Sequence, residues 1–460
     1  MHVFDAETEA FAQSVIGYAV ERLRVPKDPH WGAHPATELN LALAGALKPD
    51  GSGPEEALRL FREVLLPSCR PMDDPMNLAY VATAPTLAAT MFDLVVSATS
   101  IFGGVWESGA GAIAAENQAL RWLSDLAGFP ATAGGVFLSG GSAVNLSALA
   151  TARTVFTNRY GRPERFTVAA TDEVHASVRA AARVMDVEVL TVPADACGRM
   201  TGQALRKALA AHGIPDVFAV VATGGTTNAG AIDELDAIAD VCGEQDLWLH
   251  VDGAYGLAAL CSATGRARLS GISRADSFGV DPHKWLFAPY DCAALVYRDA
   301  SRAPETHAQH GNYLDAVDRG EWNLADYAYH LSRRARGLPL WFSLVTYGTR
   351  AYAEAVDASL ETATALAAEV SRRDGFQLLL QPELSVVLFT REGWTRDMYL
   401  QWSKQRAREG RWLVVPTSWR GEACLRICLV NPRTELAKLI AILDDLETFV
   451  PRDALQPPAI

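Results

Sequence analysis

The sequence predicts an α/β fold with a mixed, mostly parallel sheet, preceded by a helical arm and followed by a small α+β domain. From about residue 75, short runs that are apolar almost throughout alternate with alanine-rich stretches of helical spacing. Apolar runs of this kind are typical of strands buried on both faces, and alternation with helices is typical of parallel sheets. The 460 residues, 49% hydrophobic and 21% charged, are sufficient for a large buried core.

The N-terminal part, residues 1–74, is predicted to be a helical arm. Apolar positions recur with helical spacing over residues 5–23 and 55–66, and Pro54 suits a first helical turn. The segment LKPDGSGPEE, rich in glycine and proline, separates the two stretches. We therefore expect two short helices joined by an irregular connection.

The central part, residues 75–337, is predicted to form the large α/β domain. Because the carboxyl ends of parallel strands form the ligand crevice of an open α/β sheet, residues that directly follow its apolar runs are the first candidates for a site. The runs and helical stretches are, in order, GGVFLSG and SAVNLSALATARTVF, RFTVAAT and HASVRAAARVM, EVLTVPA and TGQALRKALAAH, VFAVVATGG and ELDAIADVCGEQ, then LWLHVDG, SFGVDPHKW and CAALVYR.

The last part, residues 338–460, is predicted to form a small α+β domain. A long helix begins near Leu338 and is followed by the strand-like stretch FQLLLQPELSVVLFTR. A helix over 395–409, the strand-like runs RWLVVPTSW and ACLRICLVN, and a closing helix over 433–449 complete the pattern. Strands and helices in this order are typical of an α+β domain.

Charge and cysteine content exclude several classes of function. The 54 Asp and Glu outnumber the 41 Lys and Arg, and the net charge of −13 makes nucleic acids and anionic membranes poor partners. No stretch has about 18 uninterrupted apolar residues, and the acidic N-terminus differs from a signal peptide. The seven cysteines are scattered without a C-x-x-C pair, so we expect no metal site and a reduced, cytoplasmic setting.

The sharpest local signal is Lys284, in the segment DPHKW directly after an apolar run. A lysine in apolar surroundings is poorly hydrated as an ammonium, which favours the neutral amine that forms a Schiff base with a carbonyl cofactor. Asp252 follows another apolar run, so both side chains should reach the same sheet edge. An amine and a carboxylate at one crevice suit pyridoxal phosphate (PLP), because the carboxylate keeps the pyridine nitrogen protonated. Taken singly, Lys284 is compatible with a solvated strand end and Asp252 with a helix N-cap.

Three further segments follow predicted strands. The glycines of SGGS at residues 139–142 allow close approach of the backbone, and the helix start attracts anions, so Gly141 and Ser142 are candidates to hold a phosphate. His175 has an imidazole that can stack on a pyridine ring, and Thr227 has a hydroxyl that can reach a ring oxygen. For an isolated SGGS an ordinary capped turn is the commoner interpretation, and a lone histidine at a helix start is more often a cap or a surface group. For Thr227, a loop without a ligand role is about as common.

In the order SGGSAVN, EVHASV, TGGTTNAG, HVDGAYG and DSFGVDPHKW, the sequence resembles the group II PLP-dependent amino-acid decarboxylase family, of the aromatic-L-amino-acid decarboxylase type. The resemblance spans residues 77–434. It implies the fold-type-I aminotransferase-like architecture, PLP as cofactor, and a homodimer with active sites at the subunit interface. The implied reaction is decarboxylation of an L-amino acid, by default an aromatic one, to the amine and carbon dioxide. Oxidative decarboxylation to an aldehyde and a small non-aromatic substrate are the alternatives.

The resemblance also implies roles for the candidate residues. Lys284 would form the Schiff base, Asp252 would pair with the pyridine nitrogen, and His175 would stack on the ring and help to position the substrate. These three are the expected catalytic residues. The other expected cofactor contacts are Gly141, Ser142, Thr227, Ala254, Asp281 and His283, and Thr83 would face the substrate.

Two positions depart from the family pattern. Asp281 stands where many relatives have asparagine, and a carboxylate beside a phosphate is repulsive unless it is paired or points away. Leu324 stands where an ungapped reading places the mobile-loop tyrosine that protonates the carbanion in aromatic decarboxylases. Tyr313, Tyr327 and Tyr329 lie nearby, and the sequence does not assign one of them. Without such a tyrosine the carbanion could meet dioxygen, which favours the aldehyde-forming alternative.

Residues that select the substrate are not specified by these motifs. Tyr80, Phe102 and Trp106 are candidates for an apolar or aromatic pocket, although such side chains are more often part of a core. Arg336 or Arg426 could bind a substrate carboxylate. An aromatic amino acid is therefore the expectation from the resemblance, with small apolar and acidic ones left open.

Overall fold

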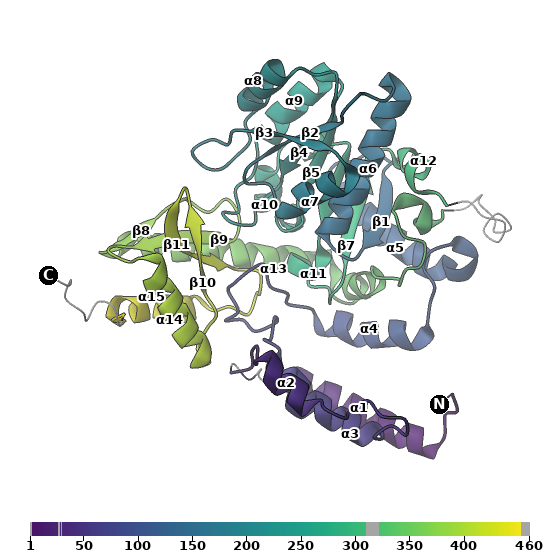
Figure 1. Cartoon of the computed structure of the whole chain (residues 1–460), viewed down its shortest axis with the longest axis vertical. Coiled ribbons are helices and arrows are strands. Elements are labelled where there is room, and N and C mark those ends of the chain that lie inside the picture. Colours follow the sequence, from purple (N-terminus) through teal and green to yellow (C-terminus); the bar gives the residue numbers. More distant parts are fainter. Residues whose placement is uncertain (1, 26–27, 29, 310–321, 452–460) are drawn as a thin grey trace.

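A seven-stranded sheet forms the centre of the computed structural model, which describes residues 2–25, 28, 30–309 and 322–451 (Figure 1). Its strands are β1 (Gly134–Leu138), β2 (Thr167–Thr171), β3 (Glu188–Val192), β4 (Val217–Thr223), β5 (Trp248–Asp252), β6 (Ser277–Val280) and β7 (Ala293–Tyr297). They are ordered β1-β7-β6-β5-β4-β2-β3. Strands β2 to β6 are parallel, whereas β7 runs antiparallel to both β1 and β6. The predicted mixed, mostly parallel sheet is confirmed.

Helices cover both faces of this sheet, as Figure 1 shows. The helices of this part are α5 (Trp106–Leu126), α6 (Gly141–Tyr160), α7 (Ala176–Met185), α8 (Gly202–His212), α9 (Leu235–Gln245), α10 (Ala263–Arg268), α11 (Pro282–Trp285) and α12 (Pro304–His307). Alternate residues of β2 show the two layers: Val168 and Ala170 pack with α6 and α7, whereas Ala169 packs with α8 and α9. The near-continuous apolar runs of the sequence thus reflect burial on both faces.

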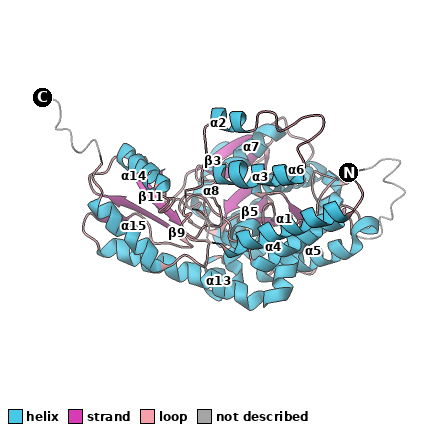
Figure 2. Ribbon diagram, turned by 90° about the horizontal axis from the view of Figure 1, so that it is seen from below, coloured by secondary structure: helices cyan, strands magenta, loops and turns pink. Residues whose placement is uncertain are grey.

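The N-terminal arm lies apart from the sheet. It contains α1 (Ala6–Arg24), α2 (Ala36–Ala42) and α3 (Pro54–Leu60), and none of the three helices has a buried residue. The helix expected over 55–66 is α-helical only to Leu60. One π-helical turn and a 3₁₀ turn containing Pro67, which has no N–H to donate, continue it to Ser68. Figures 1 and 2 show the arm beside α4 (Leu87–Thr99), on the outside of the molecule.

A second, antiparallel sheet lies beyond the long helix α13 (Leu338–Arg372), which begins where the sequence predicted. Its order is β10-β11-β9-β8. The helix α13 packs on α4 and α5 as well as on the second sheet, so it links the two parts, and the division at residue 338 stays a prediction. The remaining elements are β8 (Phe376–Leu378), β9 (Val386–Arg391), α14 (Arg396–Arg408), β10 (Val415–Trp419), β11 (Glu422–Cys428) and α15 (Leu436–Thr448).

Among the residues that the structure describes, no helix has the length and hydropathy needed to cross a membrane.

Candidate active site

The predicted site residues meet at one edge of the large sheet. Asp252 is the last residue of β5, Asp281 directly follows β6, and Gly141 begins α6 after β1. These strands point the same way, because β7 is antiparallel to both β1 and β6. The Gly141 amide donates to Asp281 Oδ2 over 3.3 Å. The expectation that strand ends bring these segments together is confirmed.

Lys284 lies on the one-turn helix α11 and is held by Asp281. Its Nζ is 2.9 Å from Asp281 Oδ2, and the lysine side chain is 22% exposed against 3% for the aspartate. The carboxylate that departs from the family pattern is therefore paired, and it points toward the Gly141 amide. Its other oxygen, Oδ1, is buried and has no hydrogen-bond partner among the described residues. The site thus combines an accessible amine with a buried carboxylate.

The start of α6 forms a close-fitting cradle beside this pair. A Cβ on Gly141 would lie 3.1 Å from the Cβ of Ala254 and 3.3 Å from Asp281 Oδ2, so only glycine leaves this space open. The 20-residue helix α6 begins here, and the positive end of its dipole favours an anion. Ser142, the next residue of α6, is exposed. Its hydroxyl is therefore accessible to a ligand of the cradle.

His283 lies against the same carboxylate. Its Nε2 is 3.7 Å from Asp281 Oδ2, and its Nδ1 accepts a hydrogen bond from the Cys292 amide over 3.2 Å. Burial lowers the pKa of His283, against the opposing effect of Asp281. Its ring centroid is 4.8 Å from that of Tyr290. His283 is therefore a neutral, oriented group at neutral pH.

Asp252 is 4% exposed and is fixed by two donors. Asn145 Nδ2 donates to its Oδ2 over 2.8 Å, and the Ala254 amide donates to its Oδ1 over 3.1 Å. Asn145 Oδ1 in turn lies 3.0 Å from His250 Nε2. Burial lowers the pKa of His250 to about 4, so its ring is neutral at pH 7. Buried side chains behind Asp252 thus fix the position of its carboxylate.

His175 belongs to the same network. It is the N-cap of α7, and its Nδ1 lies 2.8 Å from Ser177 Oγ and accepts from the Ser177 amide over 3.2 Å. Ser177 Oγ also accepts from Asn145 Nδ2 over 2.9 Å. The exposed imidazole is therefore connected through two side chains to the buried Asp252.

Sequence reasoning missed Asn145, Ser177 and His250, although the signals were present. Asn145 lies one helical turn after Gly141 and so shares its face of α6. His250 precedes Asp252 by two positions and so points to the same side of β5. Polar residues at these spacings from a predicted site residue are candidates to hold it in place by hydrogen bonds.

Thr227 is exposed and lies on a loop fastened by Arg426. Arg426 Nε and Nη2 donate to the Thr227 carbonyl over 3.0 and 2.6 Å, and Nη1 donates to the Tyr80 carbonyl. Because these carbonyls occupy its donors, Arg426 is a structural tie, and the expectation that it binds a substrate carboxylate is not supported. Thr83 is 5% exposed and lies 3.5 Å from the Ala288 carbonyl, in the segment after α11.

The side chains proposed for substrate selection differ in their surroundings. Tyr80 is 63% exposed and has a positive φ of 57°. Phe102 is half-buried and forms an isolated β-bridge with Arg334. Trp106 is partly buried and packs against the core cluster of β1 and β7. Arg336 Nε donates to Asp291 over 2.8 Å, and its buried Nη1 has no hydrogen-bond partner among the described residues.

The tyrosines near the predicted loop have distinct environments. Leu324 is fully buried in the cluster below β1 and β7, so it is a core residue. Tyr327 is 8% exposed and stacks on Trp322 at 4.3 Å, whereas Tyr329 is 54% exposed. Tyr313 lies outside the described residues. Of Tyr327 and Tyr329, Tyr329 is therefore the accessible one.

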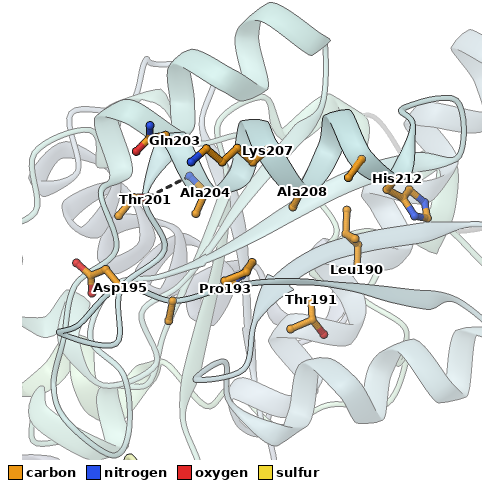
Figure 3. A pocket seen from close by; sticks show the side chains of 12 residues that line it. Leu190, Thr191, Pro193, Asp195, Thr201, Gln203, Ala204, Lys207, Ala208 and His212 are labelled. Carbon is orange, nitrogen blue, oxygen red and sulfur yellow. Dashed lines mark hydrogen bonds between the residues drawn. The ribbon is translucent and has the colours of Figure 1, made fainter.

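A cavity lies away from the predicted site residues, between β3 and α8. Its volume is about 700 Å³. Figure 3 shows Lys207 and His212 on its helical side. It includes none of the predicted site residues, which are located by the chemistry of the strand ends.

Comparisons with known proteins show the family and the fold of this chain. The family model for the pyridoxal-dependent decarboxylase conserved domain matches residues 49–392. The chain is 30% identical to an aromatic-L-amino-acid decarboxylase of Bacillus atrophaeus over 97% of both chains. It is 35% identical to an L-2,4-diaminobutyrate decarboxylase of Rhizobium meliloti, over 74% of this chain and 69% of the relative. Its fold matches Oryza sativa TDC with PLP and tryptamine at a TM-score of 0.90 and 22% identity, over 97% and 98% of the chains, which confirms the expected fold class.

Proposed function

We propose, given that the chain belongs to the pyridoxal-dependent decarboxylase family, that it decarboxylates an aromatic L-amino acid to the amine and carbon dioxide. Its class, a PLP-dependent carboxy-lyase, follows from the family. The observation that supports the assignment of the site is the placement of Lys284, just after β6, and of the buried Asp252, at the end of the neighbouring β5, at the edge of the sheet where α6 begins. We infer that Lys284, Asp252 and His175 are the catalytic residues.

The residues present fit PLP. The cradle at Gly141, which a Cβ would fill, suits a phosphate, with Ser142 and His283 beside it. The Lys284 amine is accessible for a Schiff base, and Asp252 is buried and fixed for the pyridine nitrogen. When bound there, PLP supplies a sink for the electron pair that is released as carbon dioxide leaves. In this proposal Thr227, Ala254 and Asp281 complete the cofactor contacts, and Thr83 faces the substrate.

The chain's own groups prepare this chemistry. Asp252 holds a fixed negative charge because the Asn145 amide and the Ala254 N–H prevent its rotation. Asp281 keeps the Lys284 amine directed to the edge of the sheet. His175 presents an exposed ring whose orientation is set by Ser177. Fixed dipoles and charges of this kind need no rearrangement during the reaction, which is what makes them effective.

An aromatic substrate is supported by two observations. The full-length Bacillus atrophaeus relative is an aromatic-L-amino-acid decarboxylase. The exposed Tyr80 ring is carried by a turn that Arg426 ties to the Thr227 loop, so an aromatic surface lies near the proposed cofactor contacts. The Rhizobium meliloti relative favours a second candidate, a small amino acid with a side-chain amine.

A homodimer and a cytoplasmic setting belong to the same proposal. Helices α1 to α3 bury nothing in their own chain, while Phe61 and Leu65 of the arm are exposed. Helix α4 exposes Leu87, Met91 and Leu94, which lie on one face. A second copy of the chain is the occupant that would cover these surfaces. The seven cysteines are free thiols, and five of them are buried, as suits a reducing compartment.

A panel of amino acids tests the reaction. The PLP-loaded protein is incubated with the twenty amino acids and hydroxylated aromatic ones, and carbon dioxide, amine, ammonia and hydrogen peroxide are measured. We expect carbon dioxide and amine in equal amounts from an aromatic amino acid. Stoichiometric peroxide and ammonia without amine would show that the reaction is the aldehyde-forming one. Amine from diaminobutyrate alone would show that the substrate is not aromatic. Turnover that survives Lys284→Ala would overturn the site.

A further inference from the structure

We propose that Asn145 is a positioning residue that fixes the proton of His175 on Nε2, through a chain of hydrogen bonds with a defined direction. The inference rests on the proposed function of this site and deepens it, because it states which ring nitrogen of His175 carries hydrogen. Hydrogen positions follow here from the donors and acceptors of each group, taken one after another.

The direction begins at Asp252. A carboxylate only accepts hydrogen bonds, so the atom of Asn145 that lies 2.8 Å from Asp252 Oδ2 is the amide nitrogen. The second hydrogen of the same nitrogen then goes to Ser177 Oγ at 2.9 Å. Asn145 Oδ1 must accept, and its partner is His250 Nε2 at 3.0 Å.

The groups beneath Asn145 agree with this direction. The neutral His250 ring carries one proton, which lies on Nε2 because Asn145 Oδ1 accepts it. His250 Nδ1 therefore accepts from the Ser277 hydroxyl at 2.8 Å. Ser277 Oγ accepts in turn from the indole N–H of Trp248 at 2.9 Å, and an indole nitrogen can only donate. The Trp248 end of the chain is thus compatible with the assignment that the Asp252 end requires.

The direction continues to His175. Because Ser177 Oγ accepts from Asn145, its single hydrogen is available for His175 Nδ1, which lies 2.8 Å away. The Ser177 amide also donates to this nitrogen over 3.2 Å. Two donors converge on Nδ1, so a neutral His175 carries its proton on Nε2. No described residue bonds to that nitrogen, which is therefore available to a ligand.

The tautomer defines what His175 does. An Nε2–H group donates a hydrogen bond to an anionic group, such as a substrate carboxylate, and cannot take up a proton at that atom. Release of the Nε2 proton would leave an imidazolate, or an alkoxide on Ser177 if the hydroxyl proton moved to Nδ1 at the same time. Both are unfavourable, so His175 holds an anion, and the proton that replaces carbon dioxide comes from another group.

Nitrogen-15 spectroscopy tests the tautomer directly. The full-length, PLP-loaded protein is labelled with ring-¹⁵N histidine, and long-range ¹H–¹⁵N spectra are recorded at neutral pH. His175 is assigned by the signals lost in His175→Gln. We expect a protonated Nε2 and an unprotonated Nδ1. A proton on Nδ1, or on both nitrogens, would overturn the inference.

Two variants test the part played by Asn145. In Asn145→Asp, the new carboxyl group has no hydrogen when ionised and only one, for Asp252, when protonated. It therefore cannot donate to Ser177 as the Asn145 amide does. The Ser177 hydroxyl is then no longer directed to His175. The share of the Nδ1–H tautomer should rise roughly fivefold, the effect of one ordinary hydrogen bond. Ser177→Ala removes the same donor from the other side and should give the same shift, which covers the case that Asn145→Asp does not fold.

Asn158→Asp is the matched control, because it makes the same change on an exposed part of α6, where Asn158 contacts only Glu305 among the bonds described. It should leave the tautomer as in the wild type. An unchanged His175 in both network variants would show that Asn145 has no such role. Since the spectra need no substrate, a failed amino-acid panel with an Nε2–H His175 refutes the proposed reaction alone, whereas an active enzyme with an Nδ1 proton refutes only this inference.

Discussion

Asp281 is a residue at which we expect this chain to depart from the pattern of its family. Its carboxylate contacts the Lys284 amine and the Gly141 amide, the two groups assigned to the aldehyde and to the phosphate of the cofactor. It therefore competes with the cofactor for both partners. Its buried Oδ1, which has no partner in the described chain, adds to the negative charge at the cradle.

Replacement of this charge should strengthen phosphate binding. Asp281→Asn keeps the size of the side chain and an oxygen for the Gly141 amide. We expect pyridoxine 5′-phosphate, which cannot form a Schiff base, to bind about tenfold more tightly, because the repulsion between two nearby anions is removed. Isothermal titration measures this directly. Asp299→Asn, remote from the site, should leave the affinity unchanged, and equal or weaker binding to Asp281→Asn would contradict this role.

His250 makes the stability of the protein depend on pH. Burial lowers its pKa from 6.5 to about 4 in the folded chain. Below pH 6.5 the unfolded chain takes up a proton that the folded chain does not, so stability is lost as the pH falls from 6.5 toward 4. Between pH 7 and pH 5 the loss is about 2 kcal/mol.

The comparison with His250→Gln isolates this contribution, because glutamine has a side-chain N–H to offer Asn145 and does not titrate. Urea unfolding at fixed protein concentration should show a wild type that loses about 2 kcal/mol more than the variant between pH 7 and pH 5. Parallel pH profiles of the two proteins would show that His250 is not a buried neutral base. If the wild type loses more free energy of unfolding than predicted, further titratable groups are coupled to His250.

Helix α5 and the segment before α13 are joined by a fully buried ion pair. Arg333 and Glu116 have side chains that are 0% exposed, and Arg333 also donates to the Gly103 and Phe137 carbonyls. The Gly337 amide donates to Glu116 over 2.6 Å. This pair therefore fixes the start of α13 against the end of β1, next to the sheet edge that carries the site.

Loss of one partner leaves the other charge buried. Glu116→Gln should reduce the free energy of unfolding by about 3 to 5 kcal/mol, because Arg333 then has no compensating charge. Chemical denaturation provides the value, and Glu107→Gln, an exposed glutamate on the same helix, should change it by less than about 0.5 kcal/mol. A small effect of Glu116→Gln would mean that water or another group reaches Arg333.

The elements of this fold differ in how far the sequence predicts them. The apolar runs of β2, β4 and β5 are buried at nearly every position, so their location in a covered sheet follows from composition alone. The antiparallel direction of β7 does not follow from composition, because an apolar run has the same pattern in either direction. The shortening of α3 depends on backbone details around Pro67 that a hydrophobic pattern does not express.

The site shows the same division. Lys284, Asp252 and Gly141 follow strands directly, and sheet topology brings strand ends together, so their meeting was predictable. Asn145 and His250 act through hydrogen bonds within the next layer, where the partner is decided by packing between α6 and β5. Nothing in the sequence indicates that Arg426 has partners within the chain. In the fold, however, its guanidinium donates hydrogen bonds to backbone carbonyl groups.

The whole molecule presents apolar surface that its own chain does not cover. On α4, Leu87, Met91 and Leu94 are 59%, 38% and 45% exposed, and the arm beside it has no buried residue in any of its helices. Contiguous exposed apolar surface often marks a site of protein–protein interaction. This arrangement supports a dimer in which arm and α4 pack against a second copy.

A charge on this face should prevent association. Leu94→Glu places a carboxylate in the centre of the apolar face of α4, and we expect light scattering after size exclusion to give a monomer in place of a dimer. Val184→Glu is the control, because Val184 is 75% exposed on α7 and outside this surface. A wild type that is monomeric at assay concentration would contradict the proposed assembly, as would a variant that still dimerises.

The central claim, that Lys284 holds the cofactor at this sheet edge, is tested most directly by the absorption spectrum of the purified protein with PLP. The account predicts a visible Schiff-base band that is retained in Lys207→Ala, at the distant pocket of Figure 3, and is lost in Lys284→Ala. The loss should persist at saturating PLP, because the amine itself is absent. A band of normal intensity in Lys284→Ala, or a wild-type protein that stays colourless with added PLP, would contradict it.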